Sequence, residues 1–169
     1  MEVNKTVDLE KITFLLLDCD GVLTDGRLYF GENGEAVKVF DVRDGYGLKL
    51  WHNAGFRSGI LSGRESPLVR RRADDLGIEF VITGREDKAT AFAEFLAESK
   101  VDPGELAFVG DDTIDLPLFP LVRVAFAPAD AHPAVLEAAD VVTKAGGGRG
   151  AVREVIDLIL ASHGVVTQA

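Results

Sequence analysis

Two aspartates, Asp18 and Asp20, directly follow a run of apolar residues in the segment FLLLDCDGVLTDG, residues 14–26. Residues two apart in an extended chain point to the same side, so we expect the two carboxylates to project together and Cys19 to point into a core. At about 4 Å and an effective dielectric near 20, two such anions repel by roughly 4 kcal/mol. The pair therefore predicts either a protonated carboxylic acid or a bound cation.

Further residues that could bind a ligand follow other apolar runs that we expect to be strands. They are Ser62, Gly63 and Arg64 after RSGIL, Lys88 after EFVI, and Asp111 and Asp112 after ELAFVG. Ligands of open parallel α/β sheets bind outside the carboxyl ends of the strands, so these groups should share one edge with Asp18 and Asp20. A hydroxyl, a lysine and two acidic groups together indicate phosphoryl transfer with a divalent cation.

Each residue type has a task in such a site. Oxygen ligands without histidine or cysteine favour a hard cation, and Mg²⁺ in particular. Asp18 would attack phosphorus as the nucleophile, and Asp20 would protonate the leaving alkoxide and later deprotonate the hydrolytic water. Ser62 and Lys88 would hold phosphate oxygens, and Gly21 would let backbone N–H groups approach the phosphate.

Strand and helix patterns alternate along the chain. We expect strands at residues 12–18, 57–61, 79–82, 105–111, 122–126 and 140–143, and helices at 46–53, 67–76, 86–99, 133–138 and 152–160. Ser66 should cap the second helix, and the helix at 86–99 should bury Ala89, Phe92, Ala93, Leu96 and Ala97. The alternation predicts an α/β fold, a Rossmann-like doubly wound parallel sheet with helices on both faces.

Residues 27–40 interrupt this alternation with a predicted β-hairpin that turns at Glu32-Asn33-Gly34. Its apolar residues are Tyr29, Phe30, Val37, Val39 and Phe40, and a protruding hairpin has little core of its own in which to bury them. We therefore expect partner chains to cover it. A second irregular segment, the glycine-rich residues 145–150, precedes the last helix and suggests a flexible connection.

The composition fits one domain over residues 1–169, of which 47% are hydrophobic. The net charge of −10 argues against nucleic acid or an anionic membrane as partner. One cysteine forms no internal disulfide, and the polar N-terminus resembles no secretory leader, so we expect a cytoplasmic protein.

The segments DCDGVLTDG, LSGR and GDDTIDLPLF, with a lysine between the last two, resemble the four ordered motifs of the haloacid dehalogenase superfamily. The resemblance implies that Asp18 is the nucleophile and that Asp20 is the acid/base, with its carbonyl on the metal. It implies that Asp111 supplies a second metal carboxylate. The roles of Asp112 and Asp115 stay open, and capping of a short helix is the alternative for both.

A finer resemblance covers nearly the whole chain. DGVLTDGRLYF, NGEAVKVFDVRDGYGLKL, SGRESPLVRRRADDLGI, ADAHPAV and AGGGRGAVREV are similar to the 3-deoxy-D-manno-octulosonate 8-phosphate phosphatases, a capless branch that serves lipopolysaccharide precursor synthesis. The family implies a homotetramer joined through its hairpins, with neighbouring subunits completing each site. By this resemblance Arg64 would clamp the sugar-acid carboxylate, and Arg43 and Arg149 would approach a bound anion.

Other functions fit some of these features. A nononate 9-phosphate phosphatase or a general sugar phosphatase would share the same chemistry. A non-catalytic phosphatase-like oligomerisation module would share the fold, although the acidic residues and the lysine are intact. A phospho-accepting receiver domain also gathers acids, a hydroxyl and a lysine, but its lysine follows the acids, whereas Lys88 precedes Asp111.

Overall fold

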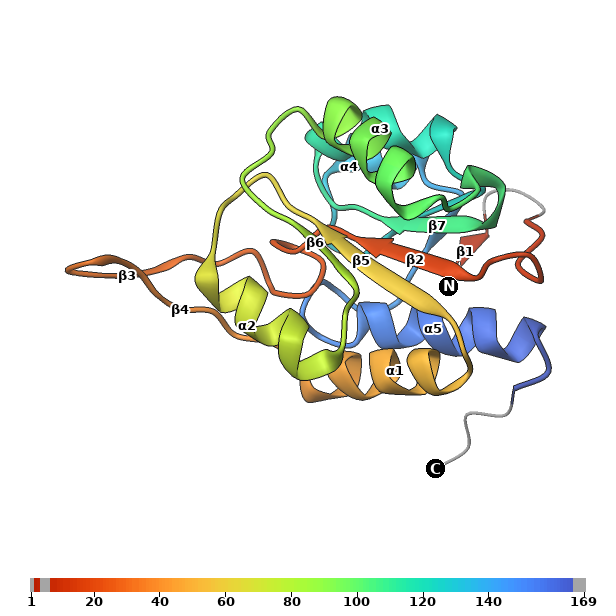
Figure 1. The fold of residues 1–169 in the computed structure, drawn as a ribbon, viewed down its shortest axis with the longest axis horizontal. Helices are drawn as coiled ribbons and strands as arrows, with labels where there is room; N and C mark the ends of the chain where they lie inside the picture. Colours follow the sequence, from red (N-terminus) through yellow and green to blue (C-terminus); the bar gives the residue numbers. More distant parts are fainter. Residues whose placement is uncertain (1, 4–6, 166–169) are drawn as a thin grey trace.

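The computed structural model describes residues 2–3 and 7–165, and its centre is a seven-stranded sheet (Figure 1). The strands lie in the order β1 (Glu2–Val3), β9 (Val141–Val142), β8 (Val124–Ala127), β7 (Leu106–Val109), β2 (Phe14–Leu17), β5 (Arg57–Leu61) and β6 (Phe80–Ile82). All neighbours pair in parallel except β1, which runs antiparallel to β9. The predicted parallel α/β sheet is confirmed.

Helices cover both faces of the sheet (Figure 1). On one face lie α1 (Val42–Asn53), α2 (Pro67–Leu76) and α5 (Ala151–Ser162); on the other lie α3 (Lys88–Ser99), α4 (Pro133–Ala138) and the 3₁₀ segment η2 (Thr113–Leu121). A short 3₁₀ turn, η1 (Pro103–Glu105), precedes β7. Each face of the sheet has its own core, the first beneath α1, α2 and α5 and the second beneath α3, α4 and η2. Because side chains alternate along β2, Leu15 and Leu17 enter the first core, and Phe14 and Leu16 enter the second.

The helix α1 begins earlier than predicted, at Val42 rather than at Tyr46. Asp41 caps it, with its side chain accepting the N–H of Arg43. Within the described residues, no helix is long and apolar enough to cross a lipid bilayer.

The predicted buried face of α3 is only partly correct. Phe92 is buried and Leu96 partly buried, as predicted, but Ala89, Ala93 and Ala97 are exposed, and the helix also buries Lys88, Ala91, Phe95 and Ser99. Two side chains favour this rotation, because the Lys88 ammonium turns inward to meet carboxylates and Phe95 packs into the core beside Phe92. The alanines carry too little apolar surface to oppose it.

Ser66 stands at the predicted start of α2, but its side chain does not cap the helix. Its hydroxyl donates instead to Glu35 of the hairpin, at 2.8 Å. The start of α2 is therefore set by Pro67, whose fixed φ suits the first helical turn.

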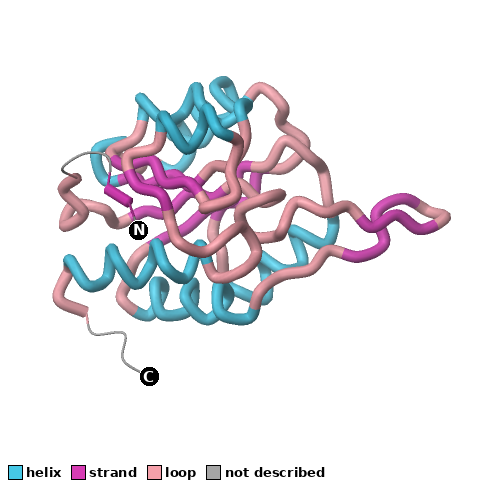
Figure 2. Tube along the Cα trace, turned by 180° about the vertical axis from the view of Figure 1, so that it is seen from behind, coloured by secondary structure: helices cyan, strands magenta, loops and turns pink. Residues whose placement is uncertain are grey.

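The hairpin of β3 (Tyr29–Gly31) and β4 (Gly34–Val37) projects from the body of the molecule, as both views show (Figures 1 and 2). Its exposed apolar side chains are Leu28, Tyr29, Phe30, Val37 and Val39, and Phe30 is 66% exposed. Phe40 departs from the prediction, since it packs partly buried against the first core.

The glycine-rich segment is closely packed in this structure. A Cβ on Gly147 would lie 1.7 Å from the carbonyl oxygen of Gly21, and the Gly148 N–H donates to Val22 at 2.9 Å. Beyond it, buried Asp44 of α1 accepts the N–H groups of Gly150 and Arg153 and so caps α5. The glycines thus allow two loops to approach each other closely. The sequence predicts a flexible connection here and does not indicate this contact.

Candidate active site

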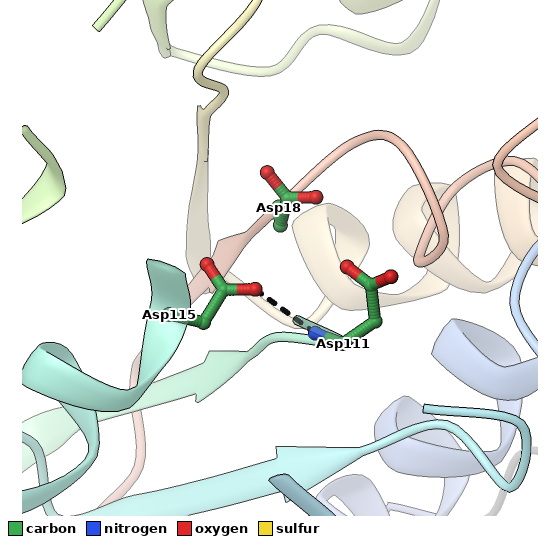
Figure 3. A group of neighbouring side chains, drawn as sticks. All are labelled: Asp18, Asp111 and Asp115. Atoms are coloured by element: carbon green, nitrogen blue, oxygen red, sulfur yellow. Dashed lines mark hydrogen bonds between the residues drawn. The ribbon is translucent and has the colours of Figure 1, made fainter. Parts of the chain in front are cut away.

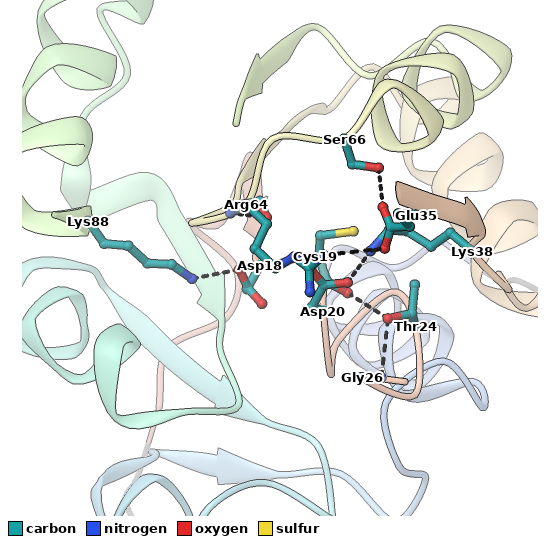
Figure 4. Close-up of polar contacts among 11 residues, drawn as sticks. Asp18, Cys19, Asp20, Thr24, Gly26, Glu35, Lys38, Arg64, Ser66 and Lys88 are labelled. Carbon is teal, nitrogen blue, oxygen red and sulfur yellow. Dashed lines mark hydrogen bonds and ion pairs between the residues drawn. The ribbon is translucent and has the colours of Figure 1, made fainter. Parts of the chain in front are cut away.

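The site forms where β2, β7 and α3 end or begin at one edge of the sheet. The Lys88 ammonium, at the first residue of α3, donates to Asp18 Oδ1 at 2.6 Å and also to Asp115 Oδ1 (Figure 4 shows the first contact). Lys88 is 2% exposed and Asp115 is fully buried. Burial of an ammonium is tolerated only with paired anions, and these two carboxylates supply them.

Asp115 orients the loop after β7 (Figure 3). Its Oδ2 accepts the backbone N–H groups of Asp111 at 2.9 Å and Asp112 at 3.2 Å. Asp112 in turn caps η2 through the Thr113 N–H, so the capping alternative for these two residues is observed. Asp115 has no oxygen left uncommitted, because Lys88 holds the other one.

One carboxylate oxygen from each of Asp18, Asp111 and Asp115 lies within 4.8 Å of the others (Figure 3). Burial raises the pKa of Asp18 from 3.8 to about 6, although Lys88 opposes the shift. Burial, followed by the charges of Asp18 and Asp115, raises the pKa of Asp111 to about 8. Burial also works to lower the pKa of Lys88, but the two carboxylates outweigh it and the pKa is raised.

This cluster fits a hard divalent cation. When all four groups are ionised, the three carboxylates and the single ammonium leave two negative charges, which one Mg²⁺ neutralises. The donors are oxygens alone, as Mg²⁺ prefers. Since Asp115 is committed to Lys88 and the backbone, Asp18 and Asp111 are the residues that would hold the ion.

Asp20 does not belong to this carboxylate group. Its Oδ1 accepts from Lys38, and its Oδ2 lies 3.8 Å from the Arg64 guanidinium. The expected repulsion between Asp18 and Asp20 was therefore misplaced, because β2 ends at Leu17 and the chain turns rather than continuing extended. Cys19 is buried in the core, as predicted.

Gly21 brings the turn after β2 against Asp111. Its φ of +97° is in the region that favours glycine, and a Cβ there would lie 2.0 Å from Asp111 Oδ2. Asp111 can therefore keep its place beside Asp18 only while residue 21 has no side chain. The contact with Asp111 is therefore one reason for a glycine at position 21. The other reason, the approach of backbone N–H groups to phosphate, stays a prediction.

Ser62, Gly63 and Arg64 form the start of the loop after β5. Ser62 is buried, its N–H donates to the Ile82 carbonyl at 2.8 Å, and its hydroxyl oxygen accepts the Arg64 N–H at 3.4 Å. The Arg64 side chain is 39% exposed and reaches toward Asp20 (Figure 4). The loop therefore lies at the edge where the sequence predicted it.

Arg43 and Arg149 make their contacts elsewhere. Arg43 pairs with Asp41 at 2.7 Å and donates to the Arg149 carbonyl at 2.8 Å. The Arg149 guanidinium lies 3.8 Å from Asp25. Both side chains are more than half exposed, so the structure does not join them to the carboxylate cluster, and their role toward substrate stays a prediction.

Sequence reasoning missed two residues of the site, Glu35 and Lys38. They come from the hairpin, yet the Lys38 side chain is only 1% exposed and bonds to Asp20 (Figure 4). The available signal was a Glu and a Lys three residues apart in a segment whose other features were apolar and turn-forming. A Glu and a Lys at this spacing usually indicate a solvated surface, and the sequence does not show which residue of the fold they contact.

Comparison with known proteins agrees with this geometry. A family model described as haloacid dehalogenase-like hydrolase matches residues 75–156. The 3-deoxy-D-manno-octulosonate 8-phosphate phosphatase KdsC of Escherichia coli K12 is 45% identical over 160 residues, which cover 95% of this chain and 85% of that protein.

Two solved structures show the same fold. The cobalt-bound deoxy-D-mannose-octulosonate 8-phosphate phosphatase of Haemophilus influenzae has a TM-score of 0.89 and 46% identity, covering 92% of this chain and 91% of its own. The phosphatase of Moraxella catarrhalis, in complex with magnesium, phosphate and KDO, has a TM-score of 0.88 and 33% identity, covering 92% and 90%.

The fold and the buried carboxylate–lysine cluster define the class, a haloacid dehalogenase-like phosphatase. Within it, the chain belongs to the family of the 3-deoxy-D-manno-octulosonate 8-phosphate phosphatases. The receiver-domain alternative is thereby excluded.

The close approach of Gly21 to Asp111 gives a first prediction. Gly21→Ala should weaken Mg²⁺ activation by about 10- to 100-fold, because the new Cβ displaces Asp111, and a Mg²⁺ titration of phosphatase activity measures it. Gly55→Ala is the matched control, since Gly55 also has a positive φ, of +87°, but has open space around its Cβ position. Equal effects of the two variants on Mg²⁺ activation would contradict the displacement.

The raised carboxyl pKa values give a second prediction. A carboxyl whose pKa rises on folding binds more protons in the folded state, so without Mg²⁺ stability should fall as pH rises from about 4 to about 8. Mg²⁺ compensates the ionised carboxylates, so the gain in Tm that Mg²⁺ gives over EDTA should be larger near pH 8 than near pH 5. Differential scanning calorimetry measures both, and Asp111→Asn should reduce the gain. A gain independent of pH would refute this account.

Proposed function

We propose that this protein is a Mg²⁺-dependent phosphatase that hydrolyses 3-deoxy-D-manno-octulosonate 8-phosphate to the free sugar acid and phosphate. The observation that carries the proposal is the buried Lys88, bonded to Asp18 and Asp115 beside Asp111. The family relationship supports the substrate, as does the KDO complex of the Moraxella catarrhalis protein.

Asp18 is the nucleophile in this proposal. Lys88 stabilises its carboxylate, and one carboxylate oxygen attacks phosphorus, so that a bond forms between Asp18 and phosphorus while the bond to the sugar oxygen breaks. Asp20 enters this step protonated, gives that proton to the leaving alkoxide, and then, as a carboxylate, takes a proton from the water that hydrolyses the aspartyl phosphate. A bound Mg²⁺ supplies charge neutralisation for the phosphate.

The other loop residues bind substrate. Ser62, Gly63 and Lys88 hold phosphate oxygens together with the backbone at Gly21, and Arg64 takes the sugar-acid carboxylate. The 39% exposure of the Arg64 side chain and its long ion-pair distances, 3.7 and 3.8 Å, leave it available to a ligand. Arg43 and Arg149 are proposed to contribute at the rim, where both are exposed.

We further propose that residues 1–169 act as one capless domain that assembles as a homotetramer. Between Asp18 and Ser62 lie only the hairpin, α1 and β5, and between Ser62 and Lys88 only α2 and β6, so neighbouring subunits would cover the substrate. The exposed Tyr29, Phe30 and Val37 on the hairpin support this assembly.

The cellular setting follows from the family resemblance. We propose a cytoplasmic protein in lipopolysaccharide precursor synthesis, with a small-molecule substrate and neither nucleic acid nor membrane as partner. The net charge of −10 supports the absence of polyanionic partners.

Replacing the nucleophile tests the mechanism. Asp18→Asn should lower kcat at least about 10³-fold, because an amide cannot attack phosphorus, while the circular dichroism spectrum stays unchanged. Phosphate release should be measured with octulosonate 8-phosphate, a nononate 9-phosphate and a neutral hexose phosphate, each with and without Mg²⁺. Full activity of Asp18→Asn would overturn the mechanism. Preference for either of the other substrates would overturn only the substrate assignment.

Charging the hairpin tests the assembly. Phe30→Asp should convert tetramer to smaller species, because the substitution places a carboxylate where apolar surface is to be buried. Analytical ultracentrifugation measures the mass, and Ile114→Asp serves as control because Ile114 is also exposed, at 49%, but lies on η2. A monomeric parent protein would disprove the tetramer.

A further inference from the structure

The hairpin also contributes to a partly buried polar cluster, through side chains other than its exposed apolar ones. The cluster consists of Glu35 and Lys38 of the hairpin with Asp20, Arg64 and Ser66 of the body (Figure 4). Lys38 Nζ bonds Asp20 Oδ1 and lies 3.2 Å from Glu35 Oε1, and Glu35 Oε2 accepts from Ser66 at 2.8 Å. Two loops of the site are thereby tied to the hairpin.

The side chain of Lys38 is 1% exposed, although the strand before it and Val39 after it are largely open to solvent. A lysine is buried this completely only where anions compensate it, and here the anions are Asp20 and Glu35. Ser66 also gives up the capping bond of α2 to reach Glu35. A cluster that only fixed the hairpin would not need to include the proposed acid/base.

The two oxygens of Asp20 differ in their surroundings. Oδ1 is held by Lys38, while Oδ2 is buried without a hydrogen-bond partner, with Arg64 at 3.8 Å. Glu35 Oε1 lies 3.2 Å from Lys38 Nζ and 3.7 Å from Arg64, so it is compensated by two cations. Asp20 Oδ2 is therefore the oxygen of this cluster that is left to bond with a ligand.

We propose that Lys38, itself oriented by Glu35, is a positioning residue that holds Asp20 Oδ1 so that Oδ2 faces the leaving oxygen of the substrate. The inference rests on the proposed role of Asp20 as acid/base. It assigns the hairpin a part in the chemistry of its own subunit, in addition to any part in assembly. Lys38 itself touches no reacting atom.

The test uses two substrates that differ in their need for a proton. A sugar phosphate releases an alkoxide, which must be protonated as it leaves, whereas p-nitrophenyl phosphate releases a nitrophenolate, which leaves without help. Lys38→Met should lower kcat/KM for the sugar phosphate about 10²-fold and for p-nitrophenyl phosphate less than about fivefold, at saturating Mg²⁺. A merely structural role would lower both equally.

Three further variants sharpen the test. Lys38→Arg keeps the cation and should recover kcat/KM for the sugar phosphate to within about fivefold of the parent protein. Glu35→Gln should show the same split between substrates at about 10-fold, because it loosens Lys38 without removing it. Lys49→Met, the same substitution at an exposed lysine of α1, should leave both values unchanged.

Each outcome decides the inference. Equal losses on both substrates, or no loss in Lys38→Met, overturn it, and if Lys38→Met fails to fold by circular dichroism, Glu35→Gln decides alone. A parent protein that prefers another sugar phosphate overturns the substrate assignment but leaves this test intact, since any alkyl phosphate it hydrolyses can be used. A parent protein without phosphatase activity overturns the proposed function itself.

Discussion

The ion pairs of the buried Lys88 ammonium are the constraint on which the rest of the site depends. The ammonium has lost its water, so Asp18 and Asp115 must stay within bonding distance, and this ties the end of β2 to the starts of α3 and η2. Asp115 also holds Asp111 in place, because its Oδ2 accepts the backbone N–H of Asp111. When ionised, the three carboxylates and Lys88 leave two excess negative charges, which a divalent cation neutralises.

Much of this arrangement could be predicted because it depends on topology. Once the apolar runs at β2, β5, β6 and β7 are taken as parallel strands, Asp18, Ser62 and Lys88 must share one edge with Asp111. What could not be predicted depends on side-chain partners across the fold. Lys88 of α3 turns inward to Asp18 and Asp115, and the partner of Asp20 is a hairpin lysine eighteen residues later in the chain. Periodicity and spacing do not identify such side-chain partners.

Glycine illustrates the same limit. A glycine in a sequence indicates freedom of the backbone, but not whether that freedom serves motion or contact. At Gly21 the missing side chain makes room for Asp111, and at Gly147 and Gly148 it lets the segment before α5 lie against the turn that follows Asp20. The turn after β2 is therefore enclosed by the Asp111 side chain on one side and by the backbone of residues 147–148 on the other, and its shape is set by packing as much as by hydrogen bonds.

The hairpin combines two surfaces that the sequence presents as one. Its exposed side chains include Tyr29, Phe30 and Val37, while Glu35 of β4 and Lys38 directly after β4 turn toward Asp20 and Arg64. Because β4 is only four residues long, a shift of its apolar end changes the position of Lys38, which follows directly after Val37. A subunit that covered the apolar end in the proposed assembly would therefore also restrain Lys38, the partner of Asp20. In a protein without a cap, the proposed assembly would then act on the proposed acid/base directly, whereas a hairpin that contacted only its neighbours would affect substrate access alone.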